Sequence, residues 1–378
     1  ALDMAAEKGE SVAFTCAYAG NLRILASLLH LMESATGGNS IPLLEEIQIL
    51  LNDQVDMFDN VSQKKEILAE YSKSCRHNLS GKQKEYSLSA LAMNLLQKAS
   101  WITEHIRSQE WINLNDTEGW YNSYYDNHGR SVEGFYEGQV RMMLTGQVFS
   151  IMGNVATDEQ IKKIIQSADH YLYKKEIGGY RLNTDFHELK FDIGRMFGFA
   201  YGEKENGAVF SHMAVMYANA LYQRGFAKEG WKVLKSLSDT ALDFDTSHIY
   251  PGIPEYFRSD GRGMYHYLTG AASWYLLTMI TEVFGVRGVS GNLLVRPKLL
   301  AEQFDENAMA SVSVTFAGKQ FLVNYSNPAR KDYGFYHISY ADCDHTPLEI
   351  TEDSNIVISR EFIEKLSSDV HEITVMLA

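Results

Sequence analysis

The 378-residue chain has few cysteines and few prolines, and it has no excess of positive charge. Its three cysteines, Cys16, Cys75 and Cys343, are odd in number and far apart, which argues against a disulfide framework. They also lack the CxxC spacing of a zinc site, so no metal site is expected. Six prolines and no low-complexity tract argue against long disordered linkers. These absences fit a folded protein in a reducing compartment, and we expect it to be cytoplasmic.

The chain also lacks the features that mark several large classes of protein. A formal net charge of -14 argues against nucleic acid as a partner, because phosphate backbones need a basic face. No apolar run reaches membrane-spanning length and no signal peptide is visible, so no membrane partner is expected. The P-loop, GxGxxG, HExxH and GxSxG motifs are missing. Any anionic ligand must therefore be held by local positive groups against the overall field.

Apolar residues recur at helical spacing along most of the first 290 residues, which predicts roughly nine helices. Thr157-Asp-Glu-Gln160 has the pattern of a capping box at the start of one of them. Short turns alternate with long polar and aromatic loops, which favours a ring of antiparallel helix pairs whose long loops open at one end. The expected helices cover residues 10–35, 41–58, 62–77, 85–110, 134–154, 157–175, 212–224, 226–240 and 268–284.

The sequence pattern changes near residue 292. Residues 311–316 alternate strictly between polar and apolar, Ala317-Gly-Lys319 forms a turn, and the alternation resumes beyond it. Further strand-like runs follow near the C-terminus. The sequence therefore predicts a mainly helical domain over residues 1–291 and a small antiparallel β domain over residues 292–378.

The loop over residues 119–133 carries three tyrosines, a tryptophan, two carboxylates, a histidine and an arginine in fifteen positions. Loops held by a rigid scaffold carry much of the function of proteins, and flat amphipathic rings suit a sugar face. A Tyr-rich turn packed on the core is the alternative interpretation of the same residues.

Two further loops and one helix start add the groups that an anion needs. The loops cover residues 201–212 and 250–263, and the helix begins near Thr269-Gly270. Backbone N–H groups at a helix N-terminus form an anion site, and an arginine such as Arg130 binds phosphate as a bidentate fork. His212 stands at a junction between loop and helix, where it can complete a phosphate cradle.

A sugar site beside a phosphate site, with one acid between them, predicts phosphorolysis. Asp126 would protonate the glycosidic oxygen while phosphate attacks the anomeric carbon from the opposite face and inverts its configuration. An inverting hydrolase instead needs a second carboxylate as the base that activates water. Glu133, Glu205 or Glu255 would have to serve as that base, and this alternative stays open.

Two segments resemble the phosphate-side motifs of glycoside hydrolase family 94, the inverting phosphorylases of cellobiose, chitobiose and related β-glucosides. These segments are ENGAVFSH at residues 205–212 and YLTGAASW at residues 267–274. The loop around Trp120 resembles the general-acid loop of the family. Three segments look most like the members that act on 1,2-β-oligoglucans, namely GWYNSYYD at residues 119–126, GYRLNTDF at 179–186 and YPGIPEYF at 250–257.

The resemblance implies a six-fold α/α barrel followed by a C-terminal β-sandwich. It implies that Asp126 is the general acid and that phosphate is a substrate, so that no separate cofactor is needed. The substrates would be β-1,2-gluco-oligosaccharides and phosphate, and a product would be α-glucose 1-phosphate. The phosphate-binding residues would be Arg130, His212, Thr269 and Gly270. The sugar-binding residues would be Trp120, Asn122, Tyr125, Arg181, Glu205 and Glu255.

The sequence departs from the family pattern in two respects. The common acid motif of the family is Asp-Trp-Asn-Asp, and a strict register would place Asn122 at the acid position. Asp126 is preferred because Arg130 then keeps the family spacing of four residues to the phosphate arginine.

The second departure is one of length. Members are much longer than this chain, and a complete barrel has twelve helices, so about three are missing here. The chain is therefore expected to be the C-terminal part of such an enzyme and to require an N-terminal region. Assembly as a homodimer is a further expectation. The rival expectation is an inactive or carbohydrate-binding fragment.

Overall fold

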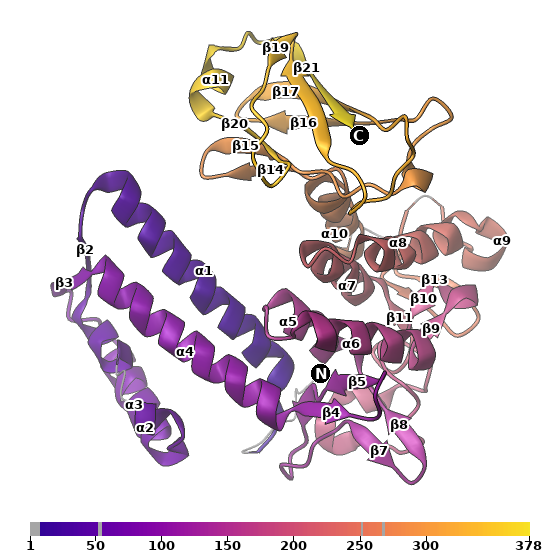
Figure 1. The fold of residues 1–378 in the computed structure, drawn as a ribbon. Helices are drawn as coiled ribbons and strands as arrows, with labels where there is room; N and C mark the ends of the chain where they lie inside the picture. The colour runs from indigo at the N-terminus through magenta and orange to yellow at the C-terminus, as the bar shows by residue number, and fades with distance from the viewer. Residues whose placement is uncertain (1–7, 52–54, 251, 267–268) are drawn as a thin grey trace. The chain divides into compact units, whose positions relative to one another are not determined.

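A computed structural model describes the chain except for residues 1–7, 52–54, 251 and 267–268 (Figure 1). It divides into two compact units, which are described separately. The N-terminal unit comprises residues Leu2–Gln139 and Thr145–Ile164, and the C-terminal unit comprises Val140–Leu144 and Ile165–Ala378. The C-terminal unit thus contains helices together with the strand-rich segment, and the predicted domain boundary at residue 292 stays a prediction.

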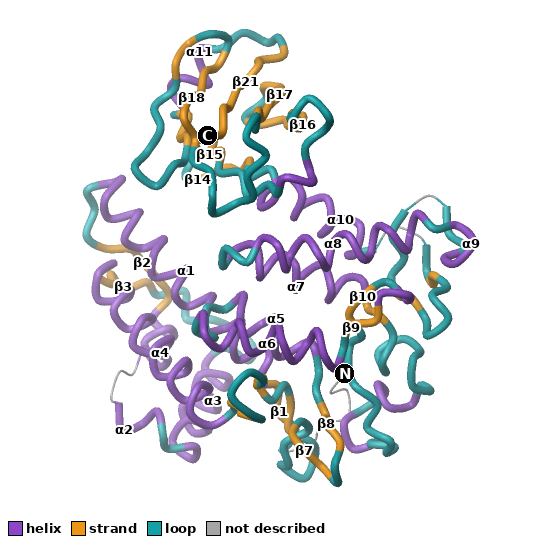
Figure 2. Tube along the Cα trace, turned by 45° about the vertical axis from the view of Figure 1, so that its right-hand side comes forward, coloured by secondary structure: helices purple, strands orange, loops and turns teal. Residues whose placement is uncertain are grey.

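Two long helices, α1 (Val12–Thr36) and α4 (Leu88–Gln109), run side by side in the N-terminal unit (Figures 1 and 2). Both begin at a serine N-cap, because Ser11 Oγ accepts from Phe14 N–H at 3.2 Å and Ser87 Oγ accepts from Ala90 N–H at 3.3 Å. Gly37, with a φ of 66°, ends α1 in the left-handed conformation that glycine favours. The two helices expected over residues 10–35 and 85–110 are confirmed.

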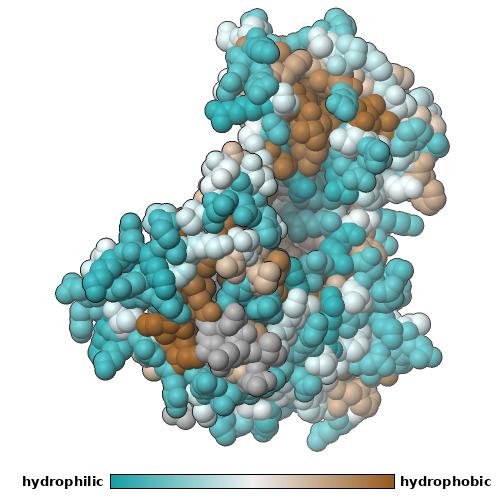
Figure 3. Space-filling model, turned by 60° about the vertical axis from the view of Figure 1, so that its left-hand side comes forward, coloured by the Kyte–Doolittle hydropathy of each residue, from teal (hydrophilic) through white to brown (hydrophobic). Residues whose placement is uncertain are grey.

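Helix α1 leaves much of its apolar surface uncovered, and hydrophobic patches interrupt the hydrophilic surface in Figure 3. By length and composition alone this helix is apolar enough to cross a membrane, although no membrane is part of the structure. The expectation that no apolar stretch reaches such a length is therefore wrong for this helix. Polar residues such as Asn21 and Arg23 interrupt the run in the sequence and concealed it. The exposed apolar side chains are Phe14, Tyr18, Ile24, Leu25, Leu28, Leu31 and Met32.

Between these helices the chain forms a small excursion of strands and short helices. Strand β2 (Ser40–Leu44) pairs antiparallel with β3 (Gln83–Ser87), and between them lie η1 (Glu45–Leu51), α2 (Val55–Phe58) and α3 (Val61–Ser74). The continuous helix expected over residues 41–58 is wrong. Pro42 disfavours a helical conformation for Ile41, and the pairing with β3 fixes this segment as a strand.

The segment around the 119–133 loop consists of short strands. Strand β4 (Trp111–Asn113) pairs with β5 (Gly119–Tyr121), and β6 (Tyr124–Tyr125) pairs with β1 (Glu10–Ser11). The loop is therefore built onto the ends of α1 and α4, and both of its strands pair with segments that adjoin these helices.

The helix expected over residues 134–154 is correct only in its second half. Strands β7 (Gly134–Tyr136) and β8 (Gln139–Arg141) precede α5 (Leu144–Met152). Gly134 and Gly138 have φ angles of 146° and 83°, which a helix does not accommodate. The next helix, α6 (Asp158–Tyr171), begins with the predicted capping box: Thr157 Oγ1 accepts from Gln160 N–H at 3.2 Å, and Gln160 Oε1 accepts from Thr157 N–H at 3.0 Å.

The helices of the C-terminal unit include α7 (Ser211–Gln223), α8 (Ala227–Leu242), the short α9 (Phe244–Ser247) and α10 (Gly270–Thr278), which continues as the π-helical turn η5 (Met279–Val283). Helix α7 is buried along most of its length between α8 and α10. The short elements before them are β9 (Tyr173–Lys174), η2 (Lys175–Ile177), β10 (Gly179–Tyr180), η3 (Phe191–Ile193) and η4 (Arg195–Gly198).

Two sheets form the C-terminal part of this unit. The three-stranded sheet contains β14 (Val286–Val289), β15 (Asn292–Val295) and β20 (Ile356–Ile358). The five-stranded sheet has the order β16 (Met309–Phe316), β17 (Lys319–Ser326), β21 (Val370–Leu377), β18 (Ile338–Cys343) and β19 (Thr346–Pro347). The short helices η6 (Ala301–Gln303) and α11 (Arg360–Lys365) lie in the connections.

The predicted hairpin of residues 311–325 is present as β16 and β17. The expected antiparallel sheet is not fully antiparallel, because β17 and β21 run parallel. After β17 the chain forms β18, β19 and β20 and then returns as β21, which pairs with the side of β17 away from β16 and runs in the same direction. The helix-rich character and the strand-rich C-terminal part are thus confirmed, while closure into a six-fold barrel stays a prediction.

Candidate active site

The residues expected to form one site fall into two groups, one in each unit. The N-terminal unit holds Trp120, Asn122, Tyr125, Asp126 and Arg130, and the C-terminal unit holds Arg181, Glu205, His212, Glu255, Thr269 and Gly270. Each group is described by itself.

Asp126 and Arg130 face each other across a tight turn. The backbone closes the turn through hydrogen bonds from Asp126 N–H to Arg130 O and from Gly129 N–H to Asp126 O, each 2.9 Å long. Gly129 supplies the left-handed residue, with a φ of 75°. The Asp126 side chain accepts from His128 N–H at 2.8 Å and from Arg130 N–H at 3.0 Å, and Arg130 Nε donates to its second oxygen at 2.8 Å. Asp126 therefore both shapes the turn and pairs with Arg130.

The electrostatic state of Asp126 follows from these bonds. Its side chain is 1% exposed, and burial by itself raises the pKa. The hydrogen bonds from Arg130 and His128 and the charge of Arg130 outweigh the burial and lower the pKa to about 2. Asp126 is therefore an ionised carboxylate at neutral pH in this conformation.

Asn122 and Tyr125 both contact a buried carboxylate, Glu110, that sequence reasoning did not select. Glu110, 7% exposed, accepts from Asn122 Nδ2 at 3.1 Å and from the Tyr125 hydroxyl at 3.0 Å. Burial, together with the charge of Glu110, raises the pKa of Tyr125 to about 12. Oδ1 of the same Asn122 side chain accepts from the backbone N–H groups of Val132 and Glu133. Asn122 therefore braces the two ends of the loop, and its sugar-binding role stays a prediction.

Trp120 and Glu133 are also enclosed by the loop. The Trp120 side chain is 0% exposed and Glu133 is 1% exposed. A carboxylate oxygen of Glu133 accepts from Ser123 N–H. Both side chains pack inside the loop in this conformation, so a sugar contact by Trp120 stays a prediction.

In the C-terminal unit a three-stranded sheet joins two of the predicted loops. Strand β11 (Val209–Phe210) pairs with β12 (Tyr256–Phe257), which pairs with β13 (Gly263–Met264). The rings of Phe210 and Tyr256 stack with centroids 4.7 Å apart. Ser211 N–H donates to the Glu255 carbonyl at 2.9 Å. The sheet therefore holds the segments of His212 and Glu255 side by side.

His212 lies directly on Gly270. A Cβ atom added to Gly270 would stand 2.6 Å from Cε1 and 2.7 Å from Nδ1 of the His212 ring, so only glycine allows this approach. Thr269 caps the helix, since its hydroxyl accepts from Ala271 N–H at 3.3 Å. Burial lowers the pKa of His212, which favours the neutral ring. The structure thus brings together His212, Thr269 and Gly270 at the N-terminus of α10.

Two atoms in this group have no hydrogen-bond partner within the described part of the chain. They are the buried Nε2 of His212 and the buried Oε2 of Glu205. The other Glu205 oxygen accepts from Arg195 at 2.7 Å, and Arg195 is a second residue that sequence reasoning did not select. A buried polar atom without a partner is costly, so these atoms are suited to bind a ligand.

Arg181 ties the loop of residues 201–212 to the preceding segment. Its guanidinium donates to the Gly207 carbonyl at 2.5 Å and lies 5.2 Å from the centre of the Tyr201 ring. Gly207 N–H in turn donates to Asn183 Oδ1 at 2.8 Å. Arg181 therefore shapes this loop in the structure, and a direct role in sugar binding stays a prediction.

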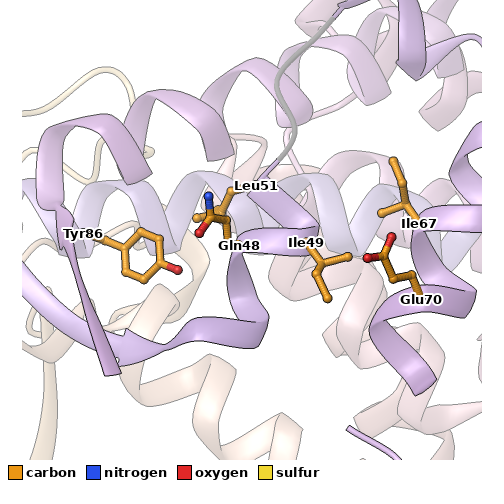
Figure 4. Close-up of a pocket in the computed structure, with 6 residues that line it drawn as sticks. All are labelled: Gln48, Ile49, Leu51, Ile67, Glu70 and Tyr86. Atoms are coloured by element: carbon orange, nitrogen blue, oxygen red, sulfur yellow. The ribbon is translucent and has the colours of Figure 1, made fainter. Parts of the chain in front are cut away.

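Two cavities lie away from these residues. One of about 460 Å³ lies in the excursion between α1 and α4. Its lining includes Gln48 and Leu51, which lie near Tyr86, and Ile67 and Glu70 of α3 (Figure 4). A larger cavity of about 940 Å³ lies along α8, and Trp231 and Lys232 contribute to its lining. Among the described residues, no cluster of histidine, cysteine and carboxylate side chains could hold a metal ion.

Comparison with known proteins identifies the relatives of this chain. Residues 79–285, more than half of the chain, match the family profile "Glycosyl hydrolase 94 superfamily, catalytic domain". The matched range contains every predicted site residue, from Trp120 to Gly270. The excursion before β3 and the strand-rich C-terminal part lie outside it.

Three curated relatives carry phosphorylase in their names. Cellobionic acid phosphorylase of Neurospora crassa is 28% identical over 235 residues, which cover 58% of this chain and 28% of that protein. Solabiose phosphorylase of Paenibacillus borealis is 25% identical over 66% of this chain and 32% of that protein. The 3-O-beta-D-glucopyranosyl-beta-D-glucuronide phosphorylase of the same organism is 23% identical over 49% of this chain and 25% of that protein. The chain thus spans about a quarter to a third of the length of these relatives.

Proposed function

Because the chain belongs to the glycosyl hydrolase 94 superfamily, we propose that it is the catalytic part of a phosphorylase that cleaves glycosidic bonds with inorganic phosphate. The family match over residues 79–285 carries this proposal, because it contains the candidate acid and all the candidate phosphate-binding residues. The names of the three relatives support it, since each of them is a phosphorylase.

In the proposed reaction Asp126 protonates the glycosidic oxygen and phosphate attacks the anomeric carbon from the opposite face. The C–O bond to the leaving sugar breaks as the bond to phosphate forms, and the configuration inverts. Phosphate is already anionic, so the reaction needs no second carboxylate as base, unlike an inverting hydrolysis. A buried carboxylate next to a polar loop is a suitable general acid once it carries a proton.

The proposed phosphate ligands are Arg130, His212, Thr269 and Gly270. Support comes from the N-terminus of the nine-residue helix α10, whose free N–H groups and dipole favour an anion. The His212 ring packs on Gly270 beside these N–H groups, and its Nε2 lacks a described partner. A neutral ring with a proton on Nε2 would donate to a phosphate oxygen.

The finer substrate assignment is a β-1,2-gluco-oligosaccharide, with α-glucose 1-phosphate as the product. It rests on the resemblance of residues 119–126, 179–186 and 250–257 to the members that act on such glucans. The names of the three relatives described above refer to other sugars, so the linkage is proposed from these segments. Sugar contacts are assigned to Trp120, Asn122, Tyr125, Arg181, Glu205 and Glu255.

We further propose that the helices belong to a six-fold α/α barrel and that activity requires an N-terminal region. The length of the relatives supports this requirement, because this chain matches only 25–32% of each. A homodimer, a cytoplasmic location and the absence of nucleic acid, membrane, metal and cofactor as partners are part of the same proposal.

The decisive experiment measures phosphate release from α-glucose 1-phosphate with sophorose as acceptor. It compares this chain with the longest polypeptide that contains it, and cellobiose serves as a second acceptor. Release that depends on sophorose supports the proposal together with the 1,2-β linkage. Release with cellobiose alone retains phosphorolysis and removes the linkage. Hydrolysis of oligosaccharides without phosphate would contradict the proposal in favour of an inverting hydrolase.

A further inference from the structure

The five-stranded sheet has two edge strands, β16 and β19, and they differ in how they are protected (Figure 1). Strand β19 has only two residues, and one of them is Pro347, which has no N–H to offer to another strand. Strand β16 has eight residues, contains neither proline nor a charged side chain, and pairs with β17 over its whole length without a bulge. Short length, proline, charge and bulges are the means by which proteins protect sheet edges. The β16 edge has none of them and is suited to pair with another strand.

Half of the backbone groups of β16 point away from β17. Met309 shows which half, because its N–H donates to Asp305 Oδ1 at 2.8 Å and its carbonyl accepts from Asp305 N–H at 2.9 Å, outside the ladder. In an antiparallel pair the outward direction recurs at every second residue. Within the described part of the chain, no group bonds the outward N–H and C=O groups of the next three such residues, Ser311, Ser313 and Thr315.

The side chains on the inner face of β16 are incompletely covered. Phe316 identifies this face, since a Cβ added to Gly288 of the three-stranded sheet would stand 2.7 Å from its ring. On the same face of the neighbouring strand β17 the side chains of Phe321, Val323 and Tyr325 are buried. Their partners on β16 are only half-buried, namely Ala310, Val312 and Val314. A further strand at this edge would cover these side chains and remove apolar surface from water.

We propose that β16 pairs with β16 of a second copy of this chain about a two-fold axis, so that two five-stranded sheets join into one. The inference deepens the homodimer part of the proposed function and does not depend on phosphorolysis. Antiparallel pairing with Ser313 opposite Ser313 also places Ser311 opposite Thr315 on both sides of the axis. Each such pair exchanges two N–H···O bonds, so about six would form across the edge. A register shifted by two residues would leave an outward residue without a partner.

The side chains of β16 favour a second copy as the partner. In this register Val312 of one copy lies opposite Val314 of the other on the inner face, and small hydroxyl side chains lie opposite one another on the outer face. Pairs of β-branched residues and pairs of hydroxyl residues both stabilise neighbouring strands. The formal net charge of -14 makes two copies repel each other, so an edge without charge is where they can approach.

The charges beyond the two ends of β16 are complementary. The turn before the strand carries the carboxylates of residues 305 and 306 and Arg330, which donates to the carbonyls of both, so this end is net negative. At the other end Lys319 donates to the carbonyls of residues 366 and 367, and residues 365–369 add one lysine and one aspartate, so this end is net positive. Antiparallel self-pairing brings the negative end of each copy to the positive end of the other.

The experiment measures the mass in solution by light scattering after gel filtration, for the longest polypeptide that contains this chain. The wild-type protein should have twice the mass of one chain. Ser313→Lys places two ammonium groups opposite each other on the axis, so the dissociation constant of the dimer should rise at least about tenfold and recover partly at high salt. The Ser313 side chain is exposed and its N–H bonds no described residue, so this variant should retain the fold.

A charge exchange tests the register. Ser313→Asp should weaken the dimer as Ser313→Lys does, and an equimolar mixture of the two variants should form a mixed dimer, because each lysine then faces an aspartate. A variant that is merely misfolded gains nothing from the mixture. Ser339→Lys and Ser339→Asp are the matched controls, since Ser339 is exposed on β18, from which β17 and β21 separate the edge. They should leave the mass unchanged.

Each outcome decides the inference. A monomeric wild-type protein would overturn it, and so would a dimer that Ser313→Lys leaves intact. A mixture of Ser313→Lys and Ser313→Asp that stays monomeric, or an equal loss in Ser339→Lys, would overturn it as well. Phosphate release from α-glucose 1-phosphate keeps the proposed function separate. Release by a monomeric wild type would remove only the edge pairing, whereas a dimer that behaves as described but releases no phosphate would remove only the phosphorylase assignment.

Discussion

The loop that holds Asp126 and the loops that hold His212 differ in how far their polar side chains are already bonded. In the first, Asn122 and Asp126 are nearly inaccessible and bonded at both ends of their side chains. In the second, His212 Nε2 and Glu205 Oε2 are buried and have no partner within the described ranges. Both groups carry residues that the sequence assigns to one reaction, but the carboxylate and amide of the first are already bonded, whereas His212 and Glu205 of the second each have an atom suited to a ligand.

This difference indicates what each group must do on binding. An open group gains hydrogen bonds directly, because a ligand satisfies atoms that now lack a partner. A saturated group must first give up an internal bond, so its participation depends on a ligand that competes for one of its members. Arg130 is the predicted site residue of this group with an exposed side chain.

The largest expected effect comes from Asp126→Asn. The amide keeps the acceptor for the N–H groups of His128 and Arg130, so the turn should persist, but it donates no proton at neutral pH. Turnover in the active polypeptide should fall by at least about 10²-fold, the lower range for general acid catalysis. Phosphate release from α-glucose 1-phosphate measures it. Near-normal turnover in a folded variant would return the acid role to Glu133 or Glu205.

The next effect concerns the loop that holds Asn122 and Asp126, and it is measured as a change in the stability of the protein. Asn122→Ala removes the side-chain acceptor of the Val132 and Glu133 N–H groups and a donor to buried Glu110, while Val132 N–H keeps its bond to the Tyr124 carbonyl at 3.0 Å. We expect the free energy of unfolding to fall by about 2 kcal/mol, since the loss of one partner of a buried polar group costs about 1–3 kcal/mol. Urea unfolding measures this change. Glu255→Ala is the control from the open group and should change stability by less than about 0.5 kcal/mol. Similar losses in both variants would erase the distinction between the groups.

A smaller effect is expected from Gly270→Ala in the open group. The new methyl would overlap the His212 ring and push it from the helix N-terminus. The overlap should reduce stability by about 1–2 kcal/mol and weaken the binding of sulfate. Gly198→Ala is the control, because a Cβ there meets nothing within 4 Å. His212→Ala in the same chain should restore stability but not sulfate binding. A harmless Gly270→Ala would show that the ring has room to move.

Sequence periodicity predicted the elements whose signals are local. The helices α1 and α4 and the capping box of Thr157 and Gln160 depend on residues within a few positions of each other. Strand β2 was mistaken for a helix, because its conformation depends on pairing with β3 some forty residues later. The parallel pairing of β17 with β21 is likewise set by the return path of the chain.

The same limit applies to the site. Asp126, Arg130 and His212 could be selected as site residues from the composition of their loops and from the resemblance to the family. The bond of Glu110 to Tyr125 and the bond of Arg195 to Glu205 arise only when distant segments meet. The ionised state of Asp126 was also out of reach of sequence, because burial and hydrogen bonds act on its pKa in opposite directions.

The smallest expected effect is a difference between the two groups in how stability depends on pH. Burial lowers the pKa of His212, so the unfolded chain binds its proton at higher pH than the folded chain does. The stability that this neutral ring contributes is complete above the unfolded pKa of about 6.5 and is lost as the pH falls below it. The Asp126 pKa is also lowered, to about 2, but its contribution is lost only below the ordinary value of 3.8. Between about pH 7 and 5, His212→Asn should therefore flatten the fall in the urea midpoint, while Asp126→Asn should leave that slope unchanged. If Asp126→Asn also flattened the slope in this range, Asp126 would titrate near neutral pH, and the hydrogen bonds of its turn would not keep it ionised.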